Sequence, residues 1–261
     1  MFTFVRHSAK IGGLLGLLCL TTMGGCSSRE PLQEQAEQFF SLPLDGSISV
    51  ENGDGALRVV GWYEPRVRVA TLRKAYTAAR LRQIGVVTKT ESNALAVRTE
   101  VLPARGFFAD RSGTVEYTIN APETSHLTLR LTNGEISLQG LRGGAAKVDL
   151  ANGRLTVINC FATIEASSAS GVMECFFDWW EKLPASINFA LGHGRIGVRL
   201  PVNARFRVNA QTASGRIGNG FGFTSSDRGP GQSLAGGTAS QPLVSLGLHT
   251  GNGNIAIDAI R

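Results

Sequence analysis

The feature that most constrains the fold is a glycine corner that recurs between short runs of alternating apolar and polar residues. The segment from Leu129 to Val157, LRLTNGEISLQGLRGGAAKVDLANGRLTV, carries this pattern twice. An apolar residue stands two places after each corner glycine, so one face of every run is apolar, which is typical of half-buried β-strands. The corner glycines lie roughly 20 residues apart except for a longer last interval: Gly134, Gly153, Gly171, Gly194, Gly215 and Gly253.

A repeat of this length predicts a β-solenoid, in which short units bury their apolar faces by stacking on one another. The predicted rungs occupy residues 127–257, with Ile136, Leu155, Ile196 and Ile255 inside. However, Asn-Gly between alternating runs is also the strongest hairpin signal, and a hairpin at each corner would give the same alternation. A hairpin meander or a β-sandwich therefore stays open as the alternative. A Gly/Ser-rich stretch at 218–242 predicts a loop inserted before the final rung.

The N-terminus predicts export and lipid attachment. Arg6 and Lys10 precede an apolar stretch that is too short to span a bilayer comfortably. Gly24 and Gly25 then stand directly before Cys26, and this arrangement resembles the lipobox of bacterial lipoproteins. The resemblance implies cleavage before Cys26 and attachment of diacylglycerol and palmitate, which anchor a protein to a membrane without a transmembrane helix.

Two details refine this prediction. Met23 occupies a position where the lipobox more often has Leu, and an ordinary signal peptide cut nearby is the alternative. Ser27 and Ser28 follow the cysteine with no Asp beside it, which by resemblance to the sorting rules of enteric bacteria favours the outer membrane. The resulting division is a signal peptide at 1–25, a lipid-anchored flexible tether at 26–43 and a β domain at 44–261.

The charge balance favours an anionic partner. The formal net charge is +6, the sequence pI is about 9.5, and most of the cations are Arg. Such a surface attracts anionic lipid or envelope polymer, and an ordinary solvated surface is the alternative. Four basic residues are predicted to lie on a short helix, indicated by Ala and Leu content, within a more sheet-like N-terminal part: Arg73, Lys74, Arg80 and Arg82. They could contact an anionic surface, or the helix could cover a sheet while the cations stay in water.

Two further groups could have a structural or a binding role. Cys160 and Cys175 are the cysteines left after the signal peptide and the lipidated residue, and an oxidising compartment would permit a disulfide between them. The alternative for Cys175 is a small core residue. The densest aromatic cluster could pack under a loop or expose a patch for a protein partner or a sugar: Phe176, Phe177, Trp179 and Trp180.

Several segments resemble a known family. The run TVEYTINAPETSHLTLRLTNGEISLQGLRGGAAKVDLANGRLTV and the earlier ISVENGDGALRVVGW are similar to bacterial putative-adhesin domains of unknown function. In those domains an I-x-x-P strand leads into repeated x-N-G-x-I-x-V rungs. The likeness covers residues 44–261 and implies a β-solenoid with a more sheet-like N-terminal part. It brings no catalytic residues, because the family has none assigned.

The residue types that carry catalysis are not arranged for it. The histidines of the β domain, His126, His193 and His249, lack metal-ligand spacing, and no nucleophile elbow or phosphate loop is present. The carboxylates on successive rungs alternate with basic residues, which indicates cross-strand ion pairs rather than a glycosidase pair: Glu135, Asp149, Glu165 and Glu174.

The sequence therefore predicts an envelope binding or structural module without cofactor, metal or catalysis. Its partners would be a membrane, through Cys26, and an anionic envelope polymer or another protein, not nucleic acid. An envelope glycan-modifying enzyme on a β-helix scaffold is the first alternative. An assembly element whose exposed end rung pairs with another chain is the second.

Overall fold

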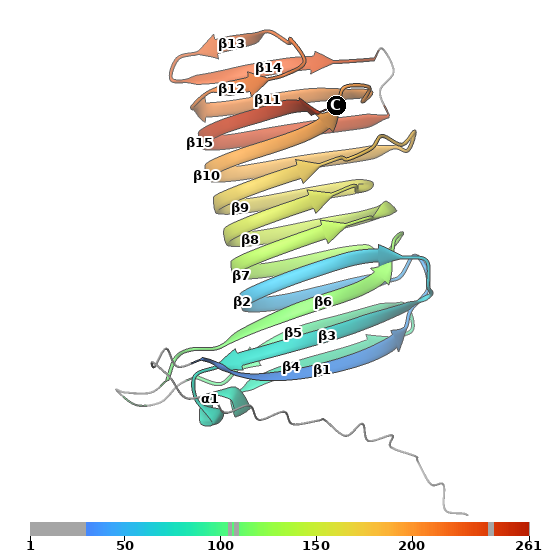
Figure 1. Ribbon diagram of the computed structural model, residues 1–261, viewed down its shortest axis with the longest axis vertical. Coiled ribbons are helices and arrows are strands. Elements are labelled where there is room, and N and C mark those ends of the chain that lie inside the picture. Colours follow the sequence, from blue (N-terminus) through green and yellow to red (C-terminus); the bar gives the residue numbers. More distant parts are fainter. Residues whose placement is uncertain (1–29, 104–105, 107–109, 240–242, 261) are drawn as a thin grey trace, which may run out of the picture.

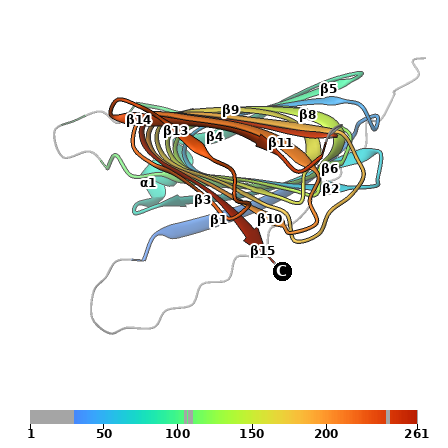
Figure 2. The same ribbon diagram turned by 90° about the horizontal axis from the view of Figure 1, so that it is seen from above.

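The described part of the chain folds into a 15-stranded sheet that doubles back on itself. The computed structural model describes residues 30–103, 106, 110–239 and 243–260, so the predicted signal peptide and Cys26 lie outside the described residues. The long strands are stacked like rungs (Figure 1). Seen from above, the rungs form two layers joined along one edge (Figure 2). In the described part of the chain, no helix has the length and apolar character needed to cross a membrane.

Each rung is one long strand that bends at its corner glycine. Neighbouring rungs run parallel and in register, with Gly153 beside Gly134 and Gly171 beside Gly153. The parallel pairing confirms the predicted solenoid and excludes antiparallel hairpins at the Asn-Gly corners. The rungs are β2 (Ser47–Trp62), β7 (His126–Gln139), β8 (Arg142–Ile158), β9 (Phe161–Phe176), β10 (Ala185–Pro201), β15 (Val244–Ile260), and β11 (Phe206–Ser214) with β12 (Ile217–Asn219).

The corners require glycine for two reasons. Gly153 has a φ of 140°, a conformation that residues with a side chain rarely adopt. A Cβ atom at Gly153 would also lie 1.8 Å from the carbonyl oxygen of Gly134. Polar side chains one residue earlier form a ladder along this edge: Asn133 Nδ2 donates to Asp54 Oδ1 (2.8 Å), and Asn152 Nδ2 donates to Asn133 Oδ1 (3.2 Å). The ladder therefore supports the stacking that the glycines permit.

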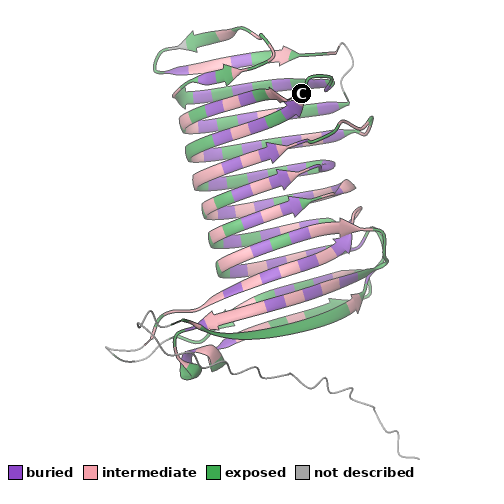
Figure 3. Ribbon diagram, in the orientation of Figure 1, coloured by how far each residue is buried: buried purple, intermediate pink, exposed green. Residues whose placement is uncertain are grey.

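The core lies between the two layers. Buried residues alternate with exposed ones along every rung (Figure 3). Ile136, Leu155, Ile196 and Ile255 are at most 1% exposed, as predicted. Because each one lies beside its counterpart on the next rung, the stack buries a continuous apolar column.

The N-terminal end is more sheet-like, as expected. The first half of β2 pairs with β5 (Ala94–Val101), and its second half pairs with β6 (Thr114–Pro122). Strand β3 (Arg66–Ala75) extends one layer beyond β6, and β4 (Ile84–Glu91) extends the other layer beyond β5. The predicted helix is shortened to α1 (Ala78–Arg82), which Thr77 caps by accepting a hydrogen bond from the Arg80 N–H.

Part of the segment predicted as a flexible tether is a strand, so that prediction is wrong for residues 32–41. Strand β1 (Leu32–Ser41) pairs antiparallel with β3 along its whole length. Nine of its ten residues are exposed. It is held by backbone hydrogen bonds and by ion pairs such as Glu37 with Arg68 (2.8 Å), and these do not require the apolar pattern that identifies a half-buried strand.

The C-terminal end departs from chain order. Strand β15, the last in the chain, lies between β10 and β11, so the final two rungs are interchanged in space. The described part of the segment predicted as a Gly/Ser-rich loop contains strands as well. There, β13 (Ser225–Arg228) and β14 (Gly231–Gly237) pair with each other, and β14 continues the layer beyond β11.

Candidate binding surfaces

Two shallow hollows lie on the outer face of the layer formed by the first halves of the rungs. One, of about 400 Å³, extends over β7, β8 and β9 and includes Arg130 and Thr132. The other, of about 310 Å³, lies over β8, β9, β10 and β15 and includes His249. They share Asp149 and Ser167, so together they form one open strip across the rungs. An open strip suits an extended polymer better than a small molecule that must be enclosed.

The outward carboxylates do not converge on a reacting centre. Glu174 on β9 lies between Arg154 (2.5 Å) and Arg195 (3.1 Å), which belong to the rungs on either side of it. Asp149 accepts a hydrogen bond from the hydroxyl of Ser167 (2.9 Å) and lies 3.7 Å from Arg130. The described residues contain no group of three His, Cys, Asp or Glu that could hold a metal ion. These contacts are the cross-rung ion pairs that the sequence predicts.

The four basic residues predicted to contact an anionic surface do not form one patch. Arg73 and Lys74 lie on β3 rather than on the helix. Arg73 bonds to Glu34 and to the carbonyl of Ile84, and Lys74 bonds to Glu116. These two cations are already engaged within the protein.

The other two basic residues lie on α1 but differ in exposure. Arg80 is buried and donates to the carbonyls of Ser112 and Leu102, each at 2.7 Å. Its guanidinium therefore ties α1 to the two segments beside it. Arg82 is exposed and alone of the four remains available to a partner.

The two cysteines are both buried free thiols, so the predicted disulfide is not formed in the structure. Burial raises the pKa of Cys160 to about 11 and raises the pKa of Cys175 well above its usual value. Because the thiolate is the reactive form, neither thiol is a good nucleophile or metal ligand. Cys175 lies in an inward column beside Val157 and Val198, which is the core position considered as its alternative.

Most of the predicted aromatic patch is packed into the interior, at the edge of the stack where loops connect the rungs. Phe177 is fully buried, and Trp180 packs against it and against Phe161, with ring centroids 5.5 and 5.8 Å apart. The guanidinium of Arg199 lies over the ring of Phe176. Trp179 alone of the four predicted residues is largely exposed, at 48%.

A charged cluster beside Trp179 was not predicted from the sequence. Arg142 binds Glu181 through two nitrogens (2.7 and 3.1 Å) and lies 3.4 Å from Glu123. Glu181 Oε1 also accepts the indole N–H of Trp179 (2.7 Å). Hydrogen bonding to Arg142 lowers the pKa of Glu181, and the same bond raises the pKa of Arg142. The cluster joins two loop residues, Glu123 and Glu181, to the first residue of β8, and nothing in the periodic pattern of the rungs indicates it.

Parallel rungs bent at stacked glycines define a solenoid-like β protein with open polar faces. The family model of Toastrack DUF4097 matches residues 43–258. The chain belongs to this family.

One solved structure supports the same fold. A putative cell adhesion protein from Clostridium sporogenes is 14% identical, with a TM-score of 0.54, and the match covers 88% of this chain and 100% of that one. A putative adhesin from Bacteroides fragilis is 12% identical over 87% of this chain and 97% of that one, with a TM-score of only 0.28. No curated protein is significantly similar in sequence. At 14% identity the likeness to the Clostridium sporogenes protein shows the fold alone.

Proposed function

We propose that the protein is a lipid-anchored, non-catalytic binding module of the bacterial cell envelope, with an anionic envelope polymer as its ligand. The observation that carries this proposal is a basic column on the second halves of the rungs. Arg154 and Arg195 both pair with Glu174, and Glu135 lies beside Arg154 in register, so with Arg216 the column has three arginines against two carboxylates. Arg216 continues the column next to Asn254 and is exposed.

The spacing of this column suits an extended ligand. Arg154 and Arg195 are two rungs apart, as are Arg195 and Arg216, because β15 lies between β10 and β12. Two rungs correspond to about 10 Å. Guanidinium groups bind carboxylates and phosphates with two parallel hydrogen bonds, and a row of them can bind successive anionic groups of one chain. The adhesin names of the structural neighbours are consistent with a binding role.

The proposed anchor is Cys26. Strand β1 begins at Leu32, so only a few residues would separate the lipid from the folded domain. An envelope protein attached by so short a connection would keep its faces close to the membrane surface. Outer-membrane localisation is part of the proposal and rests on Ser27 and Ser28.

The experiment measures binding and turnover together. The full-length chain is incubated with lipopolysaccharide, peptidoglycan fragments and anionic vesicles at about 50 and about 300 mM salt. We expect binding to at least one of them that weakens at the higher salt, and no change in the glycan. The variant with Arg154, Arg195 and Arg216 replaced by Gln should bind at least several-fold more weakly.

The matched control removes the same charge elsewhere. A variant with Arg98→Gln, Arg205→Gln and Arg207→Gln also loses three exposed arginines, but none from the column. If it weakens binding as much as the column variant, net charge and not the column is responsible. Turnover of a glycan would support the enzyme alternative. For the anchor, Cys26→Ser should give unprocessed or membrane-free protein, and an unmodified mature terminus elsewhere would contradict lipidation.

A further inference from the structure

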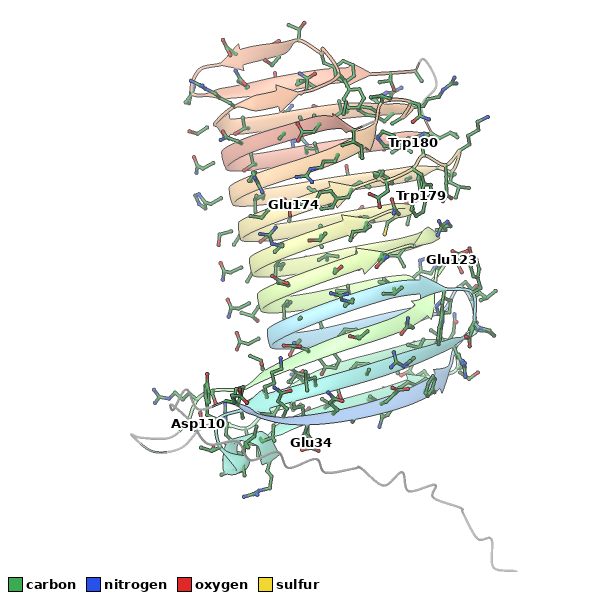
Figure 4. All side chains as sticks on the ribbon, viewed as in Figure 1. Glu34, Asp110, Glu123, Glu174, Trp179 and Trp180 are labelled. Atoms are coloured by element: carbon green, nitrogen blue, oxygen red, sulfur yellow. The ribbon has the colours of Figure 1, made fainter. Side chains whose placement is uncertain are left out.

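The tryptophans of the chain lie on the edge opposite the glycine corners. All three tryptophans of the sequence lie there: Trp62 ends β2, and Trp179 and Trp180 follow β9. Figure 4 shows Trp179, Trp180 and Glu123 along this edge, with Glu174 nearer the corners. Tyr63 directly follows Trp62 and is 79% exposed, the highest value among the exposed large hydrophobic residues of the described chain.

The centre of this edge is a fixed group of charges. The guanidinium of Arg142 is shared by Glu181 and Glu123, and it also donates to the carbonyl of Gly140 (3.3 Å). All three charged side chains are between 18% and 26% exposed, so they are held in place yet reachable from solvent. The group carries one positive and two negative charges. A polyanion is therefore disfavoured here, in contrast to the basic column.

Two aromatic rings adjoin this centre and are not used by the core. The indole N–H of Trp179 donates to Glu181, which fixes the ring while 48% of the residue stays exposed. Tyr63 directly follows Trp62, whose carbonyl accepts the backbone N–H of Glu123 (2.9 Å), so Tyr63 is attached beside the cluster. Trp180 differs, because it packs on buried phenylalanines. The ion pairs of Arg142 already hold this region together, so the exposed ring of Trp179 is not needed for that purpose.

We infer that Tyr63, Trp179 and the Arg142–Glu123–Glu181 cluster form a binding site for neutral sugar residues of a glycan. A sugar ring has an apolar C–H face that packs on an aromatic face. Its hydroxyls can donate to the carboxylates of Glu123 and Glu181 and accept from Arg142, which matches the available groups. Tyr63 follows β2 and Trp179 follows β9, three rungs further along the stack, or about 14 Å, so the site spans more than one sugar unit.

The arrangement fits binding and not hydrolysis. A glycosidase needs one carboxylic acid that stays protonated to donate to the leaving group. Here both carboxylates are ion-paired with the same guanidinium, and hydrogen bonding to Arg142 lowers the pKa of Glu181, which favours its charged form. The site is separate from the basic column and does not depend on Cys26.

The test uses isothermal titration of the full-length chain, in a detergent without a sugar headgroup, with cellohexaose, maltohexaose and N-acetylchitohexaose. We expect at least one of these to bind, with a dissociation constant that changes less than about twofold between low and high salt, because the ligand carries no charge. Trp179→Ala and Tyr63→Ala should each weaken binding by about 2- to 12-fold. Trp179→Phe should retain most of it, since an aromatic face remains.

Tyr76→Ala is the matched control, because Tyr76 is also an exposed tyrosine (55%) but lies beside α1. It should bind as the unchanged protein does. Unfolding midpoints of all variants should agree within error, which separates loss of contact from loss of structure. The inference is overturned if none of the three oligosaccharides binds. It is also overturned if Trp179→Ala and Tyr63→Ala both bind as tightly as the unchanged protein. Neither result bears on salt-sensitive binding by the arginine column, which remains the test of the proposed function.

Discussion

Replacement of Gly153 by Ala should destabilise the domain more than any replacement of a loop glycine. The φ of 140° at Gly153 is sparsely populated for residues with a Cβ atom, at a cost of about 1–3 kcal/mol. The new Cβ would lie 1.8 Å from the carbonyl oxygen of Gly134, so the backbone of the neighbouring rung must move. Overpacking of this kind costs about 1–3 kcal/mol. The expected loss is therefore about 2–6 kcal/mol, against a usual domain stability of about 5–15 kcal/mol.

Two other glycines separate these contributions. Gly143 also has positive φ (73°), but no atom lies within 4 Å of the position that a Cβ would occupy. Gly143→Ala should therefore lower stability only through backbone strain, by about 1–2 kcal/mol. Gly218 has neither feature, and Gly218→Ala should be close to neutral. Denaturant titration followed by circular dichroism measures all three, with the slopes compared to check that the unfolding transition is unchanged. A loss at Gly153 no larger than that at Gly143 would refute the argument from stacked corners.

Three further outcomes follow from the core and the titratable groups. Leu155→Ala, at a fully buried rung position, should lower the free energy of unfolding by about 2–5 kcal/mol in the same titration, and a negligible change would contradict the inward register. At about pH 8, Cys160 and Cys175 should react with a thiol reagent only after unfolding, because burial raises both pKa values, and rapid labelling of the folded protein would contradict this. The pKa of Glu181 is lowered in the folded state, so its contribution to stability is complete above the unfolded pKa and is lost as the pH falls through the folded pKa. In the Glu181→Gln variant, the free energy of unfolding should therefore fall less steeply below about pH 5. An unchanged pH profile would show that the pairing with Arg142 contributes nothing.

The repeated part of the fold could be predicted because one pattern controls several levels at once. The glycine of each corner, the apolar residue two places later and the alternation around it set the bend, the core face and the register together. Chain order was harder to predict, because all the corners are alike. Nothing in the sequence around Gly253 distinguishes a rung that follows Gly215 from one that inserts before it, and the structure places Gly253 beside Gly194.

The irregular parts could not be predicted for physical reasons. Strand β1 is held by its backbone and a few ion pairs, so its Gln/Glu-rich sequence looks like that of a solvated tether. The cluster around Arg142 depends on side chains from two loops and the start of β8, and its formation requires the stack to be assembled first. Tyr63 could be recognised only as an isolated aromatic residue, while the predicted run of aromatics at 176–180 is largely packed inside.

Disulfide trapping tests the parallel stacking of rungs most directly. Thr156 and Glu174 are register partners on β8 and β9 and both point outward, at a Cα separation of about 4.8 Å, which a disulfide can span. A hairpin at Asn152–Gly153 would instead bring Asp149 opposite Thr156, whereas in the structure these two lie on the outer faces of opposite layers. In a background with Cys160→Ala and Cys175→Val, we predict that mild oxidation cross-links the Thr156→Cys/Glu174→Cys protein and leaves Asp149→Cys/Thr156→Cys reduced. The reverse result would contradict the solenoid and support a meander of hairpins.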